Sequence, residues 1–212
     1  KIIPKSKVIE PFMNNSLVSF SFDEGGGDFG IFPYEDWRDI REVIYGQTVD
    51  NDNHELVPIK GHGALYKKGV SGTALAFDGY YTGVITDREI PNKSSFSVEG
   101  WIALDAYPFN EAPIIHKSSQ FGKKGFYLGI DAYGHPFITI NGTKIEADLI
   151  LPLYTWYHIA ATVNQNTMKL YVDGQEVATA TLGGTVDWMG LPLMVGINNS
   201  KKRGTDYVRT EQ

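Results

Sequence analysis

The stretch TWYHIAATVNQNTMKLYVDGQEVATA, from Thr155 to Ala180, decides the fold. Apolar side chains recur at every second position, which is the period of a half-buried β-strand. One face of the first predicted strand carries Tyr157, Ile159, Ala161 and Val163. The loop NQN leads to a second strand with the same alternation, and Asp173-Gly174 then supplies a two-residue turn, because glycine tolerates the positive φ of a hairpin turn. The stretch therefore predicts a three-stranded antiparallel meander.

The rest of the chain carries the same signals. SFSVEGWIAL (Ser95–Leu104) alternates with its apolar residues on one face, LVSFSF (Leu17–Phe22) alternates more briefly, and Asn141-Gly142 is a hairpin signal. Between Asp28 and His62 the pattern is irregular: EDWRDIREVIYG (Glu35–Gly46) is compatible with a short helix, and VDNDNHE (Val49–Glu55) is polar and loop-like. Many short strands with turn signals about every 8–12 residues predict an all-β sandwich or barrel.

Composition excludes several classes of protein. The 212 residues are 42% hydrophobic, include no cysteine and carry a formal net charge of −6. Disulfides and thiolate metal sites are therefore excluded. The longest basic run is Lys201-Lys202-Arg203, too little positive charge for a nucleic-acid-binding surface. No apolar run reaches membrane-spanning length, and no signal peptide is visible at the start.

Several motifs, taken in order, resemble a known family. They are VSFSFDEGGG (18–27), KKGVSGTALAFDGYY (67–81), FSVEGWI (96–102), GFYLGIDAYG (125–134), LPLYTWYHIAATVNQNTMKLYVDGQEVA (151–178) and LMVGINN (193–199). Together they resemble the laminin-G-like jelly rolls of the concanavalin A-like lectin/glucanase superfamily. The resemblance implies two antiparallel sheets packed face to face. The segment AYPFNEAPIIHK (106–117) is also similar to laminin-G-like domains that are attached to bacterial glycoside hydrolases.

The resemblance also sets the expected boundaries. Residues 1–16 are a lead-in, 17–198 form the sandwich with a long insertion at 28–62, and 199–212 are a polar tail. Members of the family close the sandwich with a further strand. This sequence ends at DYVRTEQ before any such strand. We therefore expect this chain to be a fragment, with the tail leading to a missing strand or a further domain.

Three functions fit this resemblance. The first is a non-catalytic module of a secreted bacterial glycoside hydrolase, which binds a polysaccharide or oligosaccharide or positions the catalytic domain of the same parent protein. The second is a glycoside hydrolase acting on polysaccharide, and the third is a protein-interaction domain of laminin-G type. Secretion, to the periplasm, cell surface or medium, is implied by the resemblance alone. Fold does not choose among these functions.

Carbohydrate binding favours aromatic side chains exposed in loops, because sugar C–H faces stack on aromatic rings. The candidates are Trp37 and Tyr34 in the insertion, Trp188 in VDWMG, and Tyr80 and Tyr81. The alternative is that the loop aromatics close the edge of the sandwich. Trp101 and Trp156 lie inside strand motifs, where core packing is expected.

Calcium is the metal that the resemblance implies, as a structural ion. Loop carboxylates are suitable hard ligands, and the candidates are Asp23 and Asp78. The alternative for both is a turn residue whose carboxylate accepts backbone N–H groups. His54, His62 and His135 lie in loops without metal-ligand spacing.

No catalytic motif is evident. Glucanases of the superfamily carry alternating acids on one strand, and the nearest strings are EADLIL, with Glu146 and Asp148, and FDEGGGD. EADLIL lacks the third acid and FDEGGGD lies in a loop, so both are interpreted as solvated surface. The chain contains no G-x-S-x-G nucleophile motif that could partner a catalytic histidine, so His116 and His158 are interpreted as structural.

Overall fold

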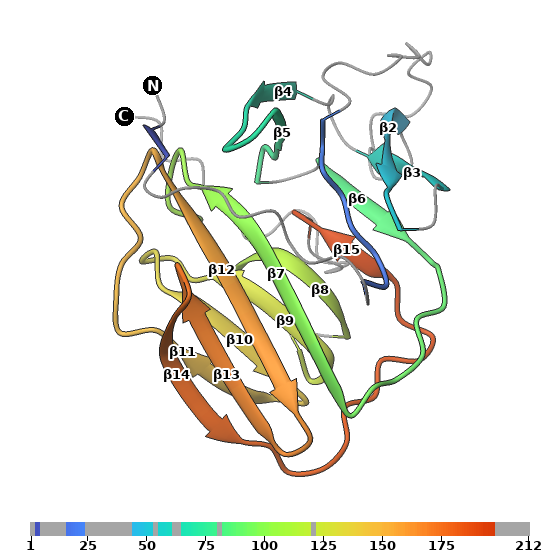
Figure 1. Cartoon of the computed structure of the whole chain (residues 1–212), viewed down its shortest axis with the longest axis vertical. Helices are drawn as coiled ribbons and strands as arrows, with labels where there is room; N and C mark the ends of the chain where they lie inside the picture. The colour runs from blue at the N-terminus through green and yellow to red at the C-terminus, as the bar shows by residue number, and fades with distance from the viewer. Residues whose placement is uncertain are drawn as a thin grey trace.

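The computed structural model describes residues 3–4, 16–23, 44–52, 55–60, 65–79, 82–119 and 122–197. The regular structure in these residues is entirely β, with fifteen strands in three sheets (Figure 1). The predicted fold class is confirmed: two antiparallel sheets form a sandwich of the jelly-roll type. Within the described ranges, no helix is long and apolar enough to cross a membrane.

The smaller sheet contains the meander that the sequence predicted. Its strands are β1 (Ile3–Pro4), β7 (Ser95–Ala103), β12 (Thr155–Asn164), β13 (Thr167–Val172) and β14 (Gln175–Thr181). β12 lies at its centre, antiparallel to β7 and to β13, and β1 pairs with the start of β12 in parallel. Among the described strands, β12 is the one that pairs with β7. The missing closing strand stays a prediction.

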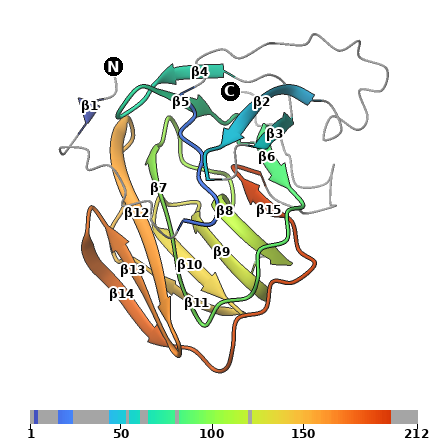
Figure 2. The same ribbon diagram turned by 45° about the vertical axis from the view of Figure 1, so that its right-hand side comes forward.

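The larger sheet has eight strands. In spatial order they are β11 (Thr143–Glu146), β10 (Pro136–Ile140), β9 (Lys124–Ile130), β8 (Ala112–Ser119), β15 (Leu193–Val195), β6 (Gly83–Thr86), β3 (Glu55–Lys60) and β2 (Ile44–Asp50). The hairpin of β4 (Leu65–Lys68) and β5 (Thr73–Ala76) forms the third sheet. Figure 2 shows β8–β11 behind the smaller sheet, with β2 and β3 at the opposite side of the molecule from β13 and β14.

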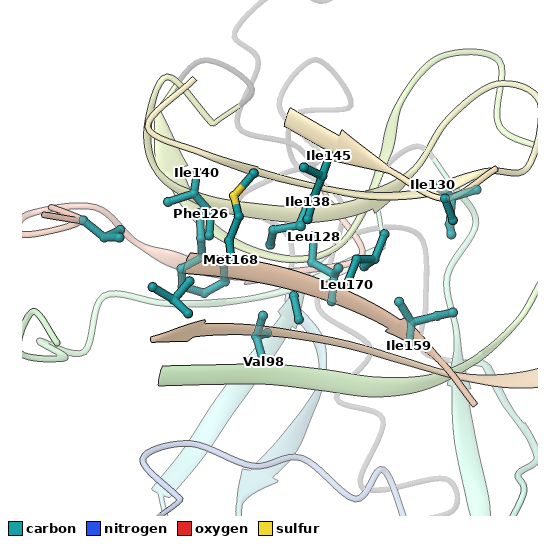
Figure 3. Close-up of a cluster of buried hydrophobic side chains, with 14 of the residues drawn as sticks. Val98, Phe126, Leu128, Ile130, Ile138, Ile140, Ile145, Ile159, Met168 and Leu170 are labelled. Carbon is teal, nitrogen blue, oxygen red and sulfur yellow. The ribbon is translucent and has the colours of Figure 1, made fainter. Parts of the chain in front are cut away.

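The main core lies between the two sheets. Figure 3 shows Phe126, Leu128, Ile138 and Ile140 of the larger sheet facing Val98, Ile159, Met168 and Leu170 of the smaller one. The alternation expected for Ser95–Leu104 and Thr155–Val172 is confirmed, because its apolar face is the one that points into this core. Burial of such side chains contributes about 1.5–3 kcal/mol each relative to exposure.

A second hydrophobic cluster lies under the other half of the larger sheet. Val57, Ile59, Leu75, Val84 and Val195 are buried in it, with Phe20 and Phe22 packed against them. β15 joins the two clusters, because Leu193 packs in the main core and Val195 in the second cluster.

Both predicted hairpin turns are confirmed. Asn141 and Gly142 have φ of 47° and 81°, and Asp173 and Gly174 have φ of 49° and 77°. Positive φ at both central positions is the requirement of a type I′ turn, whose twist matches that of the flanking strands. These two turns set the registers of β10 with β11 and of β13 with β14.

Two expectations are wrong. The insertion at 28–62 is not irregular throughout, because β2 and β3 within it form a hairpin that extends the larger sheet through β6. Residues 16–23 do not form a strand, although Phe20 and Phe22 stack on one another with ring centroids 5.8 Å apart. Their alternation reflects packing on the second cluster rather than hydrogen bonding in a sheet.

Candidate functional site

Three loops meet at one end of the sandwich because β7, β9 and β11 all run toward that end. They are 104–111 (β7–β8), 131–135 (β9–β10) and 147–154 (β11–β12), and we call them together the three-loop end. Hydrogen bonds join each loop to a neighbour. The Tyr107 hydroxyl donates to the Leu151 carbonyl (3.0 Å), Leu151 N–H donates to the Gly134 carbonyl (2.9 Å), and Tyr154 N–H donates to the Leu104 carbonyl (2.8 Å).

Exposed apolar side chains are concentrated at the three-loop end. Of the seven large hydrophobic side chains that are exposed in the described residues, five belong to these loops: Tyr107, Phe109, Tyr133, Ile150 and Tyr154. The Tyr133 and Phe109 side chains are the most exposed, at 72% and 69%. A group of exposed apolar side chains on one surface is a feature of binding sites.

The β9–β10 loop is held rigidly by Asp131. Its Oδ1 accepts N–H groups from Tyr133 (2.9 Å) and His135 (2.7 Å), and Asp131 N–H donates to the His135 carbonyl (3.0 Å). Gly134 has a φ of 92°, and a Cβ there would lie 2.4 Å from the Tyr107 ring. The turn therefore needs glycine at this position, and it presents the Tyr133 ring to solvent.

Ionisable groups lie beside the exposed aromatics. Asp131 Oδ2 and His135 Nδ1 are 3.0 Å apart, and the rings of His135 and Tyr133 have centroids 6.4 Å apart. Burial opposes ionisation of the Asp131 carboxyl, but the hydrogen bonds from the His135 ring and from two backbone N–H groups outweigh it. The pKa of Asp131 therefore lies below its ordinary value, and the group is a carboxylate at neutral pH.

Lys144 connects two more carboxylates to this end. Its Nζ lies 2.9 Å from Glu111 and 2.7 Å from Glu146, and 4.2 Å from the centroid of the Phe137 ring. Burial disfavours the ammonium form, but the two carboxylates outweigh this effect, so the pKa of Lys144 is raised. Aromatic rings flanked by carboxylates, an ammonium and an imidazole can stack on a sugar ring and bind its hydroxyl groups.

A second surface with an aromatic side chain is the outer face of the smaller sheet. Trp101 and His158 are cross-strand partners with ring centroids 5.3 Å apart, and His158 Nε2 lies 3.6 Å from a Glu99 carboxylate oxygen. The Trp101 ring is half-buried. We consider this face the alternative to the three-loop end.

The assignment of Trp188 to a carbohydrate site needs correction. This side chain is 2% exposed, and its indole N–H donates to the Ile90 carbonyl at 2.8 Å. The ring packs edge-on against Phe96 and Phe126, with centroids 4.8 and 5.7 Å away. The connection between β14 and β15 crosses the end of the sandwich and inserts Trp188 into the main core. It closes the sandwich and does not present a platform.

The remaining carbohydrate candidates, Tyr34, Trp37, Tyr80 and Tyr81, lie outside the described residues. Core packing was expected for the two strand tryptophans, but both lie on the outer face of the smaller sheet, and neither belongs to a hydrophobic cluster. Trp156 is buried, with 7% exposure, and Trp101 is half-buried on the same face.

The calcium candidates both act in turns. Asp23 Oδ1 accepts N–H from Thr73 (2.9 Å), and Asp78 Oδ1 accepts N–H from Thr82 (2.8 Å). In the described ranges neither belongs to a group of three Asp, Glu or His side chains with close ligand atoms. From the described residues, backbone carbonyls and water would have to supply the other ligands of an ion at either position. Calcium there stays a prediction.

The convergence of Asp131, His135 and Glu146 was not predicted from the sequence. His135 lacked metal-ligand spacing along the chain, and Glu146 was assigned to solvated surface. A signal was nevertheless present in the Asn141-Gly142 turn. Counting outward from this two-residue turn pairs Phe137 with Glu146, which is the observed register, and places Glu146 beside the start of β10.

Comparison with known families agrees with this architecture. The model of the Laminin_G_3 family, described as the concanavalin A-like lectin/glucanases superfamily, matches residues 78–208, more than half of the chain. The chain belongs to this family. The resemblance stated from the sequence motifs is therefore confirmed. A search of curated proteins finds no significant match.

Several solved structures are similar to this chain. Domain 4 of AbnA, a GH43 extracellular arabinanase from Geobacillus stearothermophilus in complex with arabinotriose, is 17% identical with a TM-score of 0.52, over 65% of this chain and 68% of that one. A putative carbohydrate-binding protein from Bacteroides ovatus is 22% identical (TM-score 0.44, 53% and 33% covered). The carbohydrate-binding module CBM66 from Bacillus subtilis is 18% identical (TM-score 0.40, 63% and 84% covered). At these identities the first structure supports the fold and nothing finer.

Proposed function

We propose that this domain is a non-catalytic carbohydrate-binding module, and that it binds its glycan at the three-loop end. The observation that carries the proposal is the concentration there of exposed aromatic side chains, Tyr107, Phe109, Tyr133 and Tyr154. Single exposed aromatic rings are common, but several at one end of a domain are a feature of binding surfaces. A sugar ring is a partner that needs both a flat apolar face and polar neighbours. Asp131, His135 and Lys144 supply such polar neighbours.

The setting of the module is part of the same proposal. Domain 4 of the arabinanase was solved with arabinotriose bound, and it belongs to an extracellular glycoside hydrolase. By analogy with that protein, we propose a secreted bacterial glycoside hydrolase as the parent of this chain, with the module binding the polysaccharide or oligosaccharide on which the catalytic domain acts. The analogy rests on fold, so the glycan has to come from experiment.

The test is an affinity-gel and glycan-array screen of the whole chain, including arabinans and fructans, with and without calcium. Tyr133→Ala removes the most exposed ring of the three-loop end. Because this ring is held out by the Asp131 turn and has no part in the core, the variant is expected to fold normally and to bind at least about tenfold more weakly, a loss of about 1.4 kcal/mol.

Trp101→Ala is the matched variant for the alternative surface on the smaller sheet. Unchanged binding in Trp101→Ala together with weak binding in Tyr133→Ala supports the three-loop end. The reverse result moves the site to the sheet face. A folded wild-type chain that binds no glycan overturns the carbohydrate proposal and favours a domain that positions a catalytic partner.

A further inference from the structure

A group of three metal-ligating side chains lies at the three-loop end. Asp131, His135 and Glu146 each offer one ligand atom, and these atoms all lie within 4.8 Å of one another. Within the described ranges this is the single such group. Asp131 and His135 come from the β9–β10 turn, whereas Glu146 comes from the end of β11. A contact within one turn explains why Asp131 and His135 lie close together. It does not explain why Glu146, which comes from another element, lies close to both.

The geometry of Asp131 and His135 matches two ligands of one ion. Asp131 Oδ1 is occupied by two backbone N–H groups, which leaves Oδ2 facing His135 Nδ1 at 3.0 Å. Zinc binds carboxylate oxygen and imidazole nitrogen at about 2.0–2.2 Å, so at the tetrahedral angle two ligand atoms of one zinc ion lie about 3.3–3.6 Å apart. In the absence of an ion the two atoms share a hydrogen bond, and a separation larger by about 0.5 Å would place them as two ligands of one ion. The backbone N–H groups that bind Asp131 Oδ1 hold the turn in this shape.

The local charge also favours a cation. Asp131, Glu146 and Glu111 carry three carboxylates, and Lys144 supplies one ammonium between the last two. Without the imidazole, these four groups carry a net charge of −2, which a divalent ion offsets. Lys144 competes with the ion for Glu146, but it can stay bound to Glu111 at 2.9 Å when Glu146 turns to the metal.

We propose that Asp131, His135 and Glu146 form a binding site for Zn²⁺. One imidazole nitrogen with two carboxylate oxygens is a donor set for first-row divalent metals, whereas calcium takes oxygen ligands only. Water fills the remaining coordination positions, since Glu146 is exposed. The site is separate from the turns of Asp23 and Asp78, and it does not depend on the proposed glycan binding.

The test is isothermal titration calorimetry of Zn²⁺ into the whole chain, with thermal unfolding as a second readout, because an ion that binds the folded state raises its stability. The wild-type chain should bind one equivalent at this site. His135→Gln and Glu146→Gln each remove one ligand, and each should weaken that binding at least about tenfold. Asp131→Asn should do the same while keeping the turn, because its side-chain oxygen still accepts the two N–H groups.

The matched control is His158→Gln. His158 also lies near one carboxylate, with 3.6 Å between Nε2 and a Glu99 oxygen, but it has no third ligand in the described residues. Zinc binding should be unchanged in this variant. Since His54 and His62 lie outside the described residues, the signal that identifies the site is the difference between wild type and His135→Gln.

Lys144→Gln tests whether the Lys144 ammonium competes with zinc for Glu146, and the expected change is tighter binding. Removal of the ammonium frees Glu146, so zinc should bind more tightly to this variant than to wild type. Weaker binding would contradict the competition.

The proposal is overturned if folded wild-type chain binds no zinc, if His135→Gln and Glu146→Gln bind as well as wild type, or if calcium displaces zinc at equal concentration.

Discussion

His116 places a titratable ring inside the protein. The side chain is 1% exposed, its Nδ1 lies 3.0 Å from the Ser118 hydroxyl, and its Nε2 lies 2.9 Å from the Ile197 carbonyl. A carbonyl only accepts, so Nε2 carries the proton and Nδ1 accepts from Ser118. Burial lowers the pKa of His116 to about 4, although the hydrogen bond to Ile197 opposes the shift. The ring is therefore neutral at pH 7, which excludes a role as a cation.

This shift predicts a loss of stability in acid. A pKa of about 4 in the folded state, against about 6.5 in the unfolded state, means that the unfolded chain alone takes up this proton as the pH falls from 6.5 to 4. The stabilisation is complete above pH 6.5 and is lost toward pH 4, by about 3 kcal/mol. Urea unfolding of wild type and His116→Gln at both pH values measures it. Parallel pH profiles of the two proteins would contradict the assignment.

Trp188 shows what the sequence could not predict for a single residue. The segment VDWMG predicts a loop, and an exposed tryptophan in a loop is a reasonable candidate for ligand binding. In the structure the Asn92 side chain accepts N–H from Trp188 at 3.0 Å, and the indole turns into the core between Phe96 and Phe126. These partners are more than 60 residues away along the chain, so no local pattern identifies them.

At the scale of elements, the connections between strands carry the functional features. The β9–β10 turn positions Tyr133 and His135, and its shape depends on Gly134. That residue has a φ of 92° and no room for a Cβ, which would lie 2.4 Å from the Tyr107 ring and 3.2 Å from Ile150. The turn and the β7–β8 loop are therefore packed against each other and form one surface.

Gly134→Ala is expected to lower the free energy of unfolding by about 2–4 kcal/mol, from backbone strain and from the displaced Tyr107 ring. Gly142→Ala is the matched control, because its φ is 81° and a Cβ there meets nothing within 4 Å. That variant should lose only the strain, about 1 kcal/mol. Chemical denaturation of both proteins measures the difference. Equal losses would show that Tyr107 moves aside freely.

Some elements were predictable from the sequence and others were not, for physical reasons. β7, β12 and β13 are buried on one face, so period-two alternation identifies them, and the Asp173-Gly174 turn fixes their connection. The β2–β3 hairpin was missed because its two strands are joined by the polar stretch DNDNHE (50–55), and because Gly46 and Pro58 interrupt the apolar pattern of the strands. The three-loop end was missed because its residues come from three separate connections.

At the scale of the whole molecule, one question is whether the insertion hairpin is integral to the domain. Two clusters support the larger sheet, and the main core and the second cluster meet at β8 and β15. Ile115 packs against both clusters, and β15 places Leu193 in one and Val195 in the other. Cores that share strands in this way are expected to unfold together.

The variants Ile59→Ala and Leu170→Ala test this coupling. Both side chains are fully buried, Ile59 in the second cluster and Leu170 in the main core. Each truncation should lower the free energy of unfolding by about 2–5 kcal/mol. If the domain is one cooperative unit, both variants shift a single transition, and tryptophan fluorescence and far-ultraviolet circular dichroism report the same midpoint.

An early separate transition in Ile59→Ala alone, with the main midpoint unchanged, would instead show that β3 and its neighbours unfold independently. In that case the sandwich of β7–β14 would carry the three-loop end without support from the insertion.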